Sequence, residues 1–160
     1  MENQLIYAYL AGAIDSDGFI TIGRSTRKVG EKYAHRPTYY IAKVGYVSTD
    51  RIVPDLFHKM FGGSLNEHQP KNATYKRVYL WQCTNNKAGV VVEAILPYLR
   101  QKKSQAEIVI EFIRRMDSRH NREMKLGISP EIEAERYELW EAMTKLNRPK
   151  NRRVHFLDTP

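Results

Sequence analysis

The chain has 160 residues, of which 42% are hydrophobic, a length that suits one domain with a substantial core. Lysine and arginine number 26 against 18 aspartates and glutamates, so the formal net charge is +8 and the isoelectric point lies near 9.6. This excess favours a polyanionic partner, usually a nucleic acid and less often an acidic membrane surface, while a basic protein without such a partner stays open.

Other classes are disfavoured by what the sequence contains. Cys83 is the one cysteine, so an intrachain disulfide is excluded, and no spacing typical of a zinc site occurs. The apolar runs of the chain, such as residues 90–92, are far too short to cross a bilayer, so no membrane partner is expected. The start of the chain lacks the charged and apolar regions of a signal peptide. We therefore expect an intracellular protein, in a compartment that the sequence does not indicate.

The first expected element is a helix whose C-terminal end carries acidic residues. Apolar residues recur at three- and four-residue steps from Leu5 to Ile14, which predicts a helix with one apolar stripe. Small residues gather on another side of it, at Ala8, Ala11 and Gly12, and there a second backbone can approach closely. Gly18 is placed to end the helix.

The end of this helix carries Asp15 and Asp17. The last carbonyls of a helix lack intrahelical partners and form the negative end of its dipole, so a further carboxylate there needs a cation beside it. The Asp17 carboxylate and a backbone carbonyl such as that of Ser16 are the hard oxygen ligands that Mg²⁺ binds. The open alternative is an ordinary polar helix end before a glycine turn, because acids are common near turns.

Two strands are expected next. β-Branched residues from Phe19 to Lys28 predict one strand, and alternation from Pro37 to Ser48 predicts its antiparallel partner. Arg24 falls on the inner side of the first strand, which suggests that the core ends before it. The side chains expected to face outward are Thr21, Gly23, Ser25 and Arg27 on the first strand and Tyr39, Ile41, Lys43 and Gly45 on the second; Tyr40, Ala42, Val44 and Tyr46 should face the core.

A helix and a second hairpin follow. Apolar residues from Ile52 to Met60 keep helical spacing up to a stop at Gly62 and Gly63. Ser64 to Gln69 and Tyr75 to Thr84 then predict two strands. Both faces of the later strand carry apolar groups, Val78 and Leu80 against Tyr79 and Trp81, so alternation does not decide which face is buried. We expect Asn66, His68 and Arg77 to face outward.

Three helices and a basic tail complete the chain. We expect helices over residues 87–96, closed by Pro97, over residues 104–116 and from Pro130 through Leu146, with a loop over residues 117–127. The tail from Asn147 is rich in arginine and lysine and has little to hold it until something anionic binds. The expected domain is therefore 1–146, and the tail is 147–160.

This order of helix, two strands, helix, two strands and helices indicates an α+β fold with one four-stranded antiparallel sheet, covered by helices on one face. Residues 10–18, LAGAIDSDG, resemble the signature of the LAGLIDADG homing endonucleases at seven of nine positions, with Ala13 and Ser16 as the departures. The segment from Pro97 to Ala106 and the Gly62-Gly63 pair resemble the same family, so the resemblance extends to about Met116. It implies the αββαββα fold with a saddle-shaped sheet and, in this chain, extra C-terminal helices.

The resemblance also implies an activity, a site-specific double-strand DNA endonuclease that hydrolyses phosphodiester bonds. It implies a divalent cation, Mg²⁺ or another such as Mn²⁺, with Ca²⁺ as a non-activating substitute. Asp17 would be a catalytic residue and a metal ligand, with Ser16 as a second metal ligand beside it. Lys102 would lie by the active site. Without the resemblance, the alternative is that Lys102 is an ordinary solvated lysine. The position from which family members often hold a water is Tyr46 here, or Ser48 if the register differs, so the residue that orients the nucleophile stays open.

The chain contains one copy of the motif, whereas a double-strand cut needs two centres. We therefore expect a homodimer packed through Ala8, Ala11, Gly12 and Asp15, on a pseudo-palindromic duplex of about twenty base pairs. An intron-RNA maturase that binds its own intron RNA, a DNA-binding protein that does not cleave, and more remotely a ribosome-associated protein are the alternatives. The residues expected to contact double-stranded DNA are Thr21, Arg24, Ser25, Arg27, Tyr39, Lys43, Asn66, His68 and Arg77.

Overall fold

The computed structural model describes residues 2–25, 38–69, 76–117 and 129–148. Helix α1 (Glu2–Asp17) leads directly into β1 (Gly18–Ser25), and β2 (Tyr39–Ser48), α2 (Ile52–Phe61), β3 (Ser64–His68) and β4 (Val78–Thr84) follow. The C-terminal part holds α3 (Asn86–Ile95), the 3₁₀ helix η1 (Leu96–Tyr98), α4 (Lys103–Asp117) and α6 (Pro130–Asn147). The expected order of helices and strands is confirmed. None of the described helices is both long enough and apolar enough to span a membrane.

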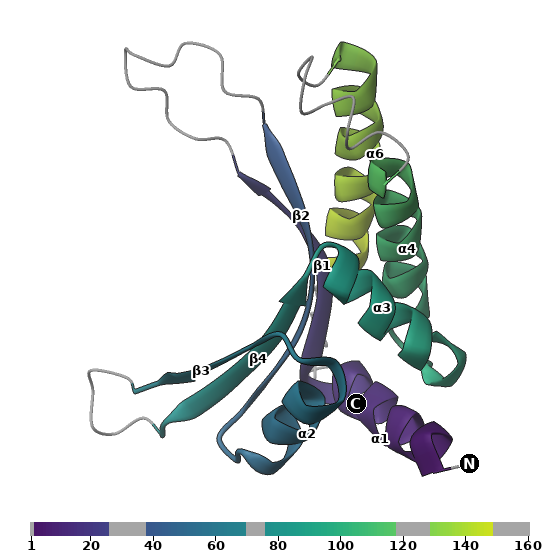
Figure 1. Ribbon diagram of the computed structural model, residues 1–160. Coiled ribbons are helices and arrows are strands. Elements are labelled where there is room, and N and C mark those ends of the chain that lie inside the picture. The colour runs from purple at the N-terminus through teal and green to yellow at the C-terminus, as the bar shows by residue number, and fades with distance from the viewer. Residues whose placement is uncertain (1, 26–37, 70–75, 118–128, 149–160) are drawn as a thin grey trace, which may run out of the picture.

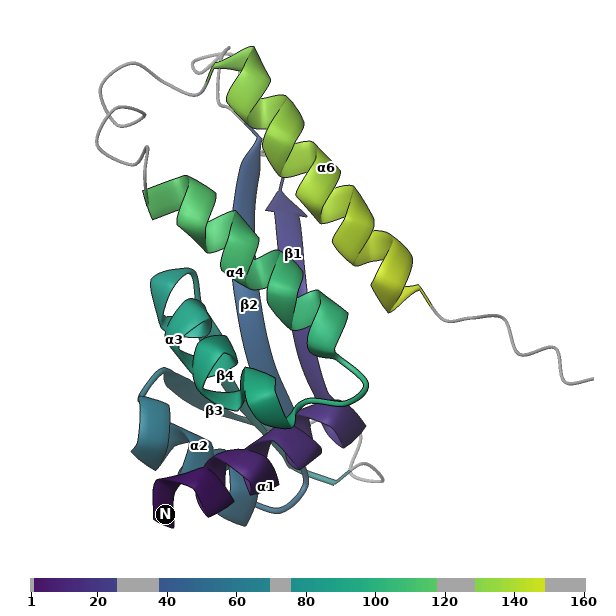
Figure 2. The same cartoon turned by 90° about the vertical axis from the view of Figure 1, so that its right-hand side faces the viewer.

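The four strands form one antiparallel sheet in the order β1-β2-β4-β3. The expected α+β fold with a four-stranded antiparallel sheet is therefore confirmed. Figure 1 shows the β1/β2 pair and the β3/β4 pair diverging toward the left, away from the helices. Figure 2, turned by 90°, shows α4 and α6 lying in front of β1 and β2.

One side of this sheet is covered by helices, and no described helix covers the other side, which we call the open face (Figure 1). The side chains of the open face belong to the strand residues that alternate away from the helices. They are Phe19, Thr21, Gly23 and Ser25 on β1, Tyr39, Ile41, Lys43, Gly45 and Val47 on β2, Ser64, Asn66 and His68 on β3, and Val78, Leu80, Gln82 and Thr84 on β4.

The helix-covered side of the sheet carries the core. All four expected core residues of β2 are buried, which confirms that part of the pattern; they are Tyr40, Ala42, Val44 and Tyr46. Trp81 and Cys83 of β4 are buried beside them, which decides the strand whose alternation was ambiguous. Trp81 stacks on Phe57 of α2 with ring centroids 4.3 Å apart, and its Nε1–H donates to the carbonyl of Gly62 at 2.7 Å. Because a buried indole N–H needs such an acceptor, this bond fixes which face of β4 packs inward.

Helix α1 packs differently from the stripe expected for it. Leu10, Ala11 and Ile14 are fully buried, whereas Leu5 is 75% exposed and Tyr9 is 55% exposed. The expected apolar stripe was therefore wrong at Leu5 and Tyr9. Ala11 faces the core because a small residue lets the helix approach its own sheet, a partner that the sequence pattern does not reveal.

Helix α6 lies against β1 and α4. The side chain of Ser129 accepts a hydrogen bond from the backbone N–H of Ile132 at 3.4 Å and so caps the helix at its start. The guanidinium of Arg24 lies 5.3 Å from the ring centroid of Tyr137 and 5.2 Å from that of Trp140. At the other end, Asn147 Nδ2 donates to the carbonyl of Ile20 at 3.0 Å. These contacts join the extra C-terminal helix to the strand that follows Asp17.

Two glycines of the open face make a matched test of this packing. A Cβ on Gly45 would lie 2.4 Å from Cζ of Phe19 and 2.8 Å from the backbone oxygen of Trp81, whereas a Cβ on Gly23 would meet nothing nearer than 3.8 Å. We expect Gly45→Ala to lower the free energy of unfolding by about 1 to 3 kcal/mol, because backbone must shift. Gly23→Ala should leave it unchanged or raise it by about 0.5 kcal/mol, because alanine orders a strand at lower entropic cost.

Urea denaturation of the two variants beside the wild type measures both changes. Equal midpoints for Gly45→Ala and Gly23→Ala would contradict the close packing of Phe19 over Gly45.

Candidate active site

The C-terminal end of α1 is bound to the loop that precedes α4 through Asp15. Its side chain is only 8% exposed, and its Oδ2 accepts a hydrogen bond from the backbone N–H of Arg100 at 2.6 Å. Its Oδ1 accepts a second one from the backbone N–H of Lys102 at 2.9 Å. A carboxylate that receives two backbone N–H groups is strongly held. Asp15 therefore lies inside its own fold, and its expected place in a dimer interface was wrong.

Lys102, in the loop, donates hydrogen bonds from its side chain to backbone carbonyls of the helix. Its Nζ donates to the carbonyl of Ile14 at 2.6 Å and to that of Asp15 at 2.7 Å. These are two of the terminal carbonyls that a helix leaves without intrahelical partners. Burial lowers the pKa of the Lys102 ammonium, and the nearby carboxylates of Asp15 and Asp17 oppose this shift. The side chain is half-buried and doubly bonded, so the alternative of a freely solvated lysine is wrong.

Asp17 is the acid at this helix end whose carboxylate remains available to bind a ligand. Its side chain is exposed, and within the described ranges it has no hydrogen-bond or ion-pair partner. The hydroxyl of Ser16 donates back to the carbonyl of Ala13 at 3.1 Å, and the backbone carbonyl of Ser16 lies next to Asp17 in the chain. An unpaired carboxylate, terminal carbonyls and the negative end of a helix dipole together fit a hard divalent cation.

The described residues of one chain do not complete such a site. No cluster of three histidine, cysteine, aspartate or glutamate side chains that could hold a metal ion occurs among the described residues. A cation at Asp17 would therefore need further ligands from beyond this part of the chain, such as phosphate oxygens, waters or a second copy of the helix end.

Tyr46 lies beside this helix end on the helix-covered side of β2. Its register partner is Gly18, the residue after Asp17. Burial raises the pKa of the Tyr46 phenol, and the negative charge of Asp17 raises it further, while a hydrogen bond with Ser48 acts against both. The phenol is therefore protonated at neutral pH, as an ordinary tyrosine is, and both effects keep it so. Ser48 is held in turn, since its hydroxyl accepts the backbone N–H of Asp50 at 3.0 Å.

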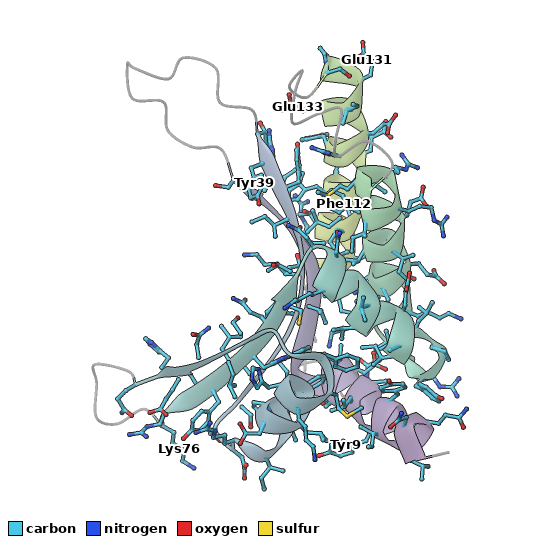
Figure 3. The ribbon with its side chains drawn as sticks, in the orientation of Figure 1. Tyr9, Tyr39, Lys76, Phe112, Glu131 and Glu133 are labelled. Atoms are coloured by element: carbon cyan, nitrogen blue, oxygen red, sulfur yellow. The ribbon has the colours of Figure 1, made fainter. Side chains whose placement is uncertain are left out.

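The open face next to this site carries no acid among its described strand residues. Lys43 is its one lysine or arginine in the same set, and most of the rest are hydroxyl, amide or apolar side chains. Figure 3 shows Tyr39 on this open side of β2 and Phe112 on the opposite side, among the helices. Of the nine expected DNA contacts, the structure brings six together here: Thr21, Ser25, Tyr39, Lys43, Asn66 and His68.

Three of the expected DNA contacts are not placed on the open face. Arg24 lies on the helix-covered side, over the rings of Tyr137 and Trp140, so its assignment is corrected. Arg77 forms an ion pair with Glu67 at 2.8 Å and donates to Gln69 at 3.1 Å, and Glu67 is on the helix-covered side with Leu65. The outward assignment of Arg77 is therefore also corrected. Arg27 lies outside the described residues.

The sequence pattern missed several open-face residues. Gln82, Thr84 and Ser64 lie there with Val47, Val78 and Leu80. The signal that could have found them is the burial of Trp81, because it sets the alternation of the whole strand.

The exposed stripe of α1 also differs from the one expected. Ala11 and Asp15 are buried in the fold of the chain, and Ala8 is half-buried. Gly12 remains exposed, and a Cβ added to it would meet nothing within 4 Å. The stripe that actually faces solvent, which we call the outer α1 stripe, consists of Leu5, Tyr9, Gly12 and Ser16.

Asp15 and Asp17 should respond differently to the same change. Asp15→Asn replaces a carboxylate oxygen that accepts a backbone N–H by an NH₂ group, and we expect it to lower the free energy of unfolding by about 2 kcal/mol. Asp17→Asn should leave that free energy unchanged or raise it by about 0.5 kcal/mol, because it removes a negative charge from the negative end of α1. Thermal and urea unfolding measure both, and a larger loss for Asp17→Asn would contradict these assignments.

Comparisons with known proteins agree with this architecture. No protein-family model and no curated protein matches the chain. Among solved structures it is similar to the homing endonuclease I-CvuI in complex with the I-CreI DNA target, in the presence of 2 mM Mg with the DNA not cleaved. The TM-score is 0.71 at 21% identity, over 94% of this chain and 87% of that one.

Two further structures show the same fold. The archaeal intron-encoded homing endonuclease I-Vdi141I, complexed with DNA, has a TM-score of 0.67 at 15% identity, over 93% of this chain and 88% of that one. The I-SmaMI LAGLIDADG homing endonuclease, bound to cleaved DNA, has a TM-score of 0.64 at 15% identity, over 88% of this chain but 44% of that one. The chain therefore has the fold of the LAGLIDADG homing endonucleases.

Proposed function

We propose that this chain is a site-specific DNA endonuclease that cuts both strands of a duplex with a divalent cation and acts as a homodimer. The observation that carries the proposal is the Asp17 carboxylate, which is exposed and unpaired among the described residues, at a helix end that Asp15 and Lys102 hold in place. The fold and its DNA-bound neighbours support it.

The open face supports binding to duplex DNA. It lacks acids among its described strand residues, and the chain carries a net charge of +8, so a polyanion meets no repulsion there. A twisted antiparallel pair of strands fits the major groove, where base edges present distinct donors and acceptors. Strand β2 has 10 residues, which at about 3.3 Å each match about ten base pairs, the length of a half-site.

The helix end supports hydrolysis of a phosphodiester. The residues that would hold a divalent cation are Asp17 and the backbone carbonyl of Ser16, with phosphate oxygens of the DNA. When bound, such an ion polarises the phosphate and makes a coordinated water more acidic. Attack of the water oxygen on phosphorus forms one P–O bond, and the bond to the 3′ oxygen breaks, with a proton passing to that leaving oxygen.

Lys102 and Tyr46 would act beside Asp17. Lys102 places a fixed positive charge next to the phosphate oxygens on which negative charge develops, while two of its N–H groups hold the helix end. Tyr46 lies close enough to Asp17 for that charge to raise its pKa, so its protonated hydroxyl can donate to or accept from a water there. We propose that Tyr46 orients the nucleophilic water, where related enzymes often use another polar residue.

A homodimer follows from the need for two centres. The chain has one motif, and its described residues offer one unpaired carboxylate at the site, whereas a double-strand cut needs two such carboxylates. The outer α1 stripe ends at Ser16, beside Asp17, so two copies packed on it would bring two Asp17 side chains together. The chain matches I-CvuI over most of its length but only 44% of I-SmaMI, which leaves room there for a second unit of this size.

Asp17→Asn tests the catalytic assignment. We expect it to abolish cleavage in Mg²⁺ or Mn²⁺, because an amide does not replace the charge of a carboxylate ligand, and to leave affinity for DNA within about threefold. The measurement is incubation with a randomised duplex library, sequencing of the cut ends, and then binding and cleavage assays on the selected site. Glu107→Gln, an exposed acid on α4, is the matched control and should cleave like the wild type.

Two outcomes would contradict the proposal. Cleavage by Asp17→Asn at the wild-type rate would mean that the site lies elsewhere. A wild-type protein that selects a duplex but never cuts it in any divalent cation would indicate a DNA-binding protein without nuclease activity.

Gly12→Arg tests the homodimer. The arginine has open space in the monomer, and it favours a helix more than glycine does, so the fold should be at least as stable as the wild type. A bulky charge in the middle of the outer α1 stripe should prevent a second copy from packing, and double-strand cleavage should be lost with it. Sedimentation velocity with and without the selected DNA measures the oligomeric state, and Gly12→Ala serves as the control. A Gly12→Arg variant that still sediments as a dimer would place the interface elsewhere.

A further inference from the structure

The open face is divided along its length into parts of different chemistry. Side chains of Cα register partners lie side by side on one face of a sheet, so the register defines rows across it. One row joins Val47 of β2, Leu80 of β4 and Asn66 of β3. The neighbouring row joins Val78 of β4 and His68 of β3. We call these five residues the apolar rows.

The apolar rows are exposed to a ligand and are not an extension of the core. Val47 is 38% exposed, and Leu80 and Val78 are half-buried, whereas Trp81 and Cys83 on the opposite side of β4 are fully covered. The polar members, Asn66 and His68, are both exposed, and neither bonds to another described side chain. Three neighbouring aliphatic groups flanked by one amide and one imidazole therefore face whatever binds the sheet.

The charge on the rows is as informative as their shape. Guanine is usually read by a bidentate arginine or lysine, and cytosine by a carboxylate. The apolar rows contain none of these side chains, and Lys43, on the same face of β2, is four residues or about 13 Å from Val47 along the strand. The rows therefore lack the cation and the carboxylate that usually read a G·C pair.

The same rows match an A·T pair. In the major groove this pair presents the N7 acceptor and N6 donor of adenine next to the C5-methyl group of thymine. An asparagine amide accepts from N6 and donates to N7, and aliphatic side chains pack on the methyl group. Asn66 and Leu80 are register partners, so an amide and an aliphatic group lie side by side, as the two halves of one pair require.

We propose that the apolar rows recognise A·T pairs through Asn66 on adenine and Leu80, with Val47 and Val78, on thymine methyl groups. This inference rests on the proposed function, because it names the base pairs that the DNA-binding face prefers. It also gives their place in the half-site. Along the strand direction, Val47 and Leu80 lie one residue beyond Tyr46, the register partner of Gly18, and Val78 lies three residues beyond it. The apolar rows therefore lie about 3 to 10 Å, or about one to three base pairs, from the cleavage end.

Replacing single thymines by uracil tests the inference, because uracil lacks only the C5-methyl group. Each thymine of the selected site is replaced in turn, and the relative cleavage rates of the two duplexes are measured in competition. At one or more positions of the inner half-site, we expect the wild type to cut the uracil duplex about fourfold more slowly, the effect of losing one buried methyl group.

Leu80→Ala should lose this discrimination and cut the thymine and uracil duplexes at equal rates. Ser64→Ala, in the neighbouring row of the same face, is the matched control and should keep the fourfold difference. Asn66→Ala adds a second measurement: 7-deazaadenine, which lacks N7, should slow the wild type and leave this variant unaffected. Thermal unfolding confirms that each variant is folded.

The outcomes separate this inference from the proposed function. A protein that cuts a selected site with G·C pairs at these positions, or that treats uracil like thymine throughout, would overturn the inference and leave the endonuclease standing. Persistent thymine discrimination by Leu80→Ala would assign the methyl contact to another residue and overturn the role of Leu80. A protein that neither binds nor cuts any duplex of the library would overturn both.

Discussion

The arrangement of the site depends on a reciprocal pair of contacts between α1 and the loop before α4. Asp15 on the helix accepts backbone N–H groups from the loop, and Lys102 on the loop donates to backbone carbonyls of the helix. Each charged side chain thus satisfies the other element's backbone; Asp15 is buried and Lys102 is half-buried. Since the strand that follows α1 begins directly after Asp17, these contacts also fix where the sheet starts relative to the loop.

Asp15 and Asp17, the two acids of the motif, have different roles because the helix turn places their side chains on different sides. Asp15 points into the fold and acts as an anchor, whereas Asp17, two residues on, points outward and keeps its charge available. Without the anchor, the second carboxylate would sit on a fraying helix end, where its position relative to a phosphate would vary. With the anchor, the position of the Asp17 carboxylate is fixed before any ligand arrives, whereas ordering it on binding would cost affinity.

The sequence predicted the order of elements and most of β1 and β2, because alternation is decisive where one face is purely apolar. It failed where two faces are both apolar, as in β4, since only the packing of Trp81 on Phe57 separates them. It also failed for Ala11 and Asp15, because their partners lie on distant segments that periodicity does not reveal. Arg24 illustrates the same limit. A basic residue at a strand end suggests a DNA contact, and the sequence does not show that its guanidinium lies over two aromatic rings of α6.

The two sides of the sheet contribute differently to the stability of the fold. Its helix-covered side carries the core and the contacts that position Asp17, while its open side adds little to that core apart from Phe19 over Gly45. Side chains on the open face can therefore change without disturbing the helix end. This separation gives a physical reason why chains that are only 15% to 21% identical to this one keep its backbone with TM-scores of 0.64 to 0.71. The core constrains the fold, whereas the side chains of the open face are free to differ from one protein to the next.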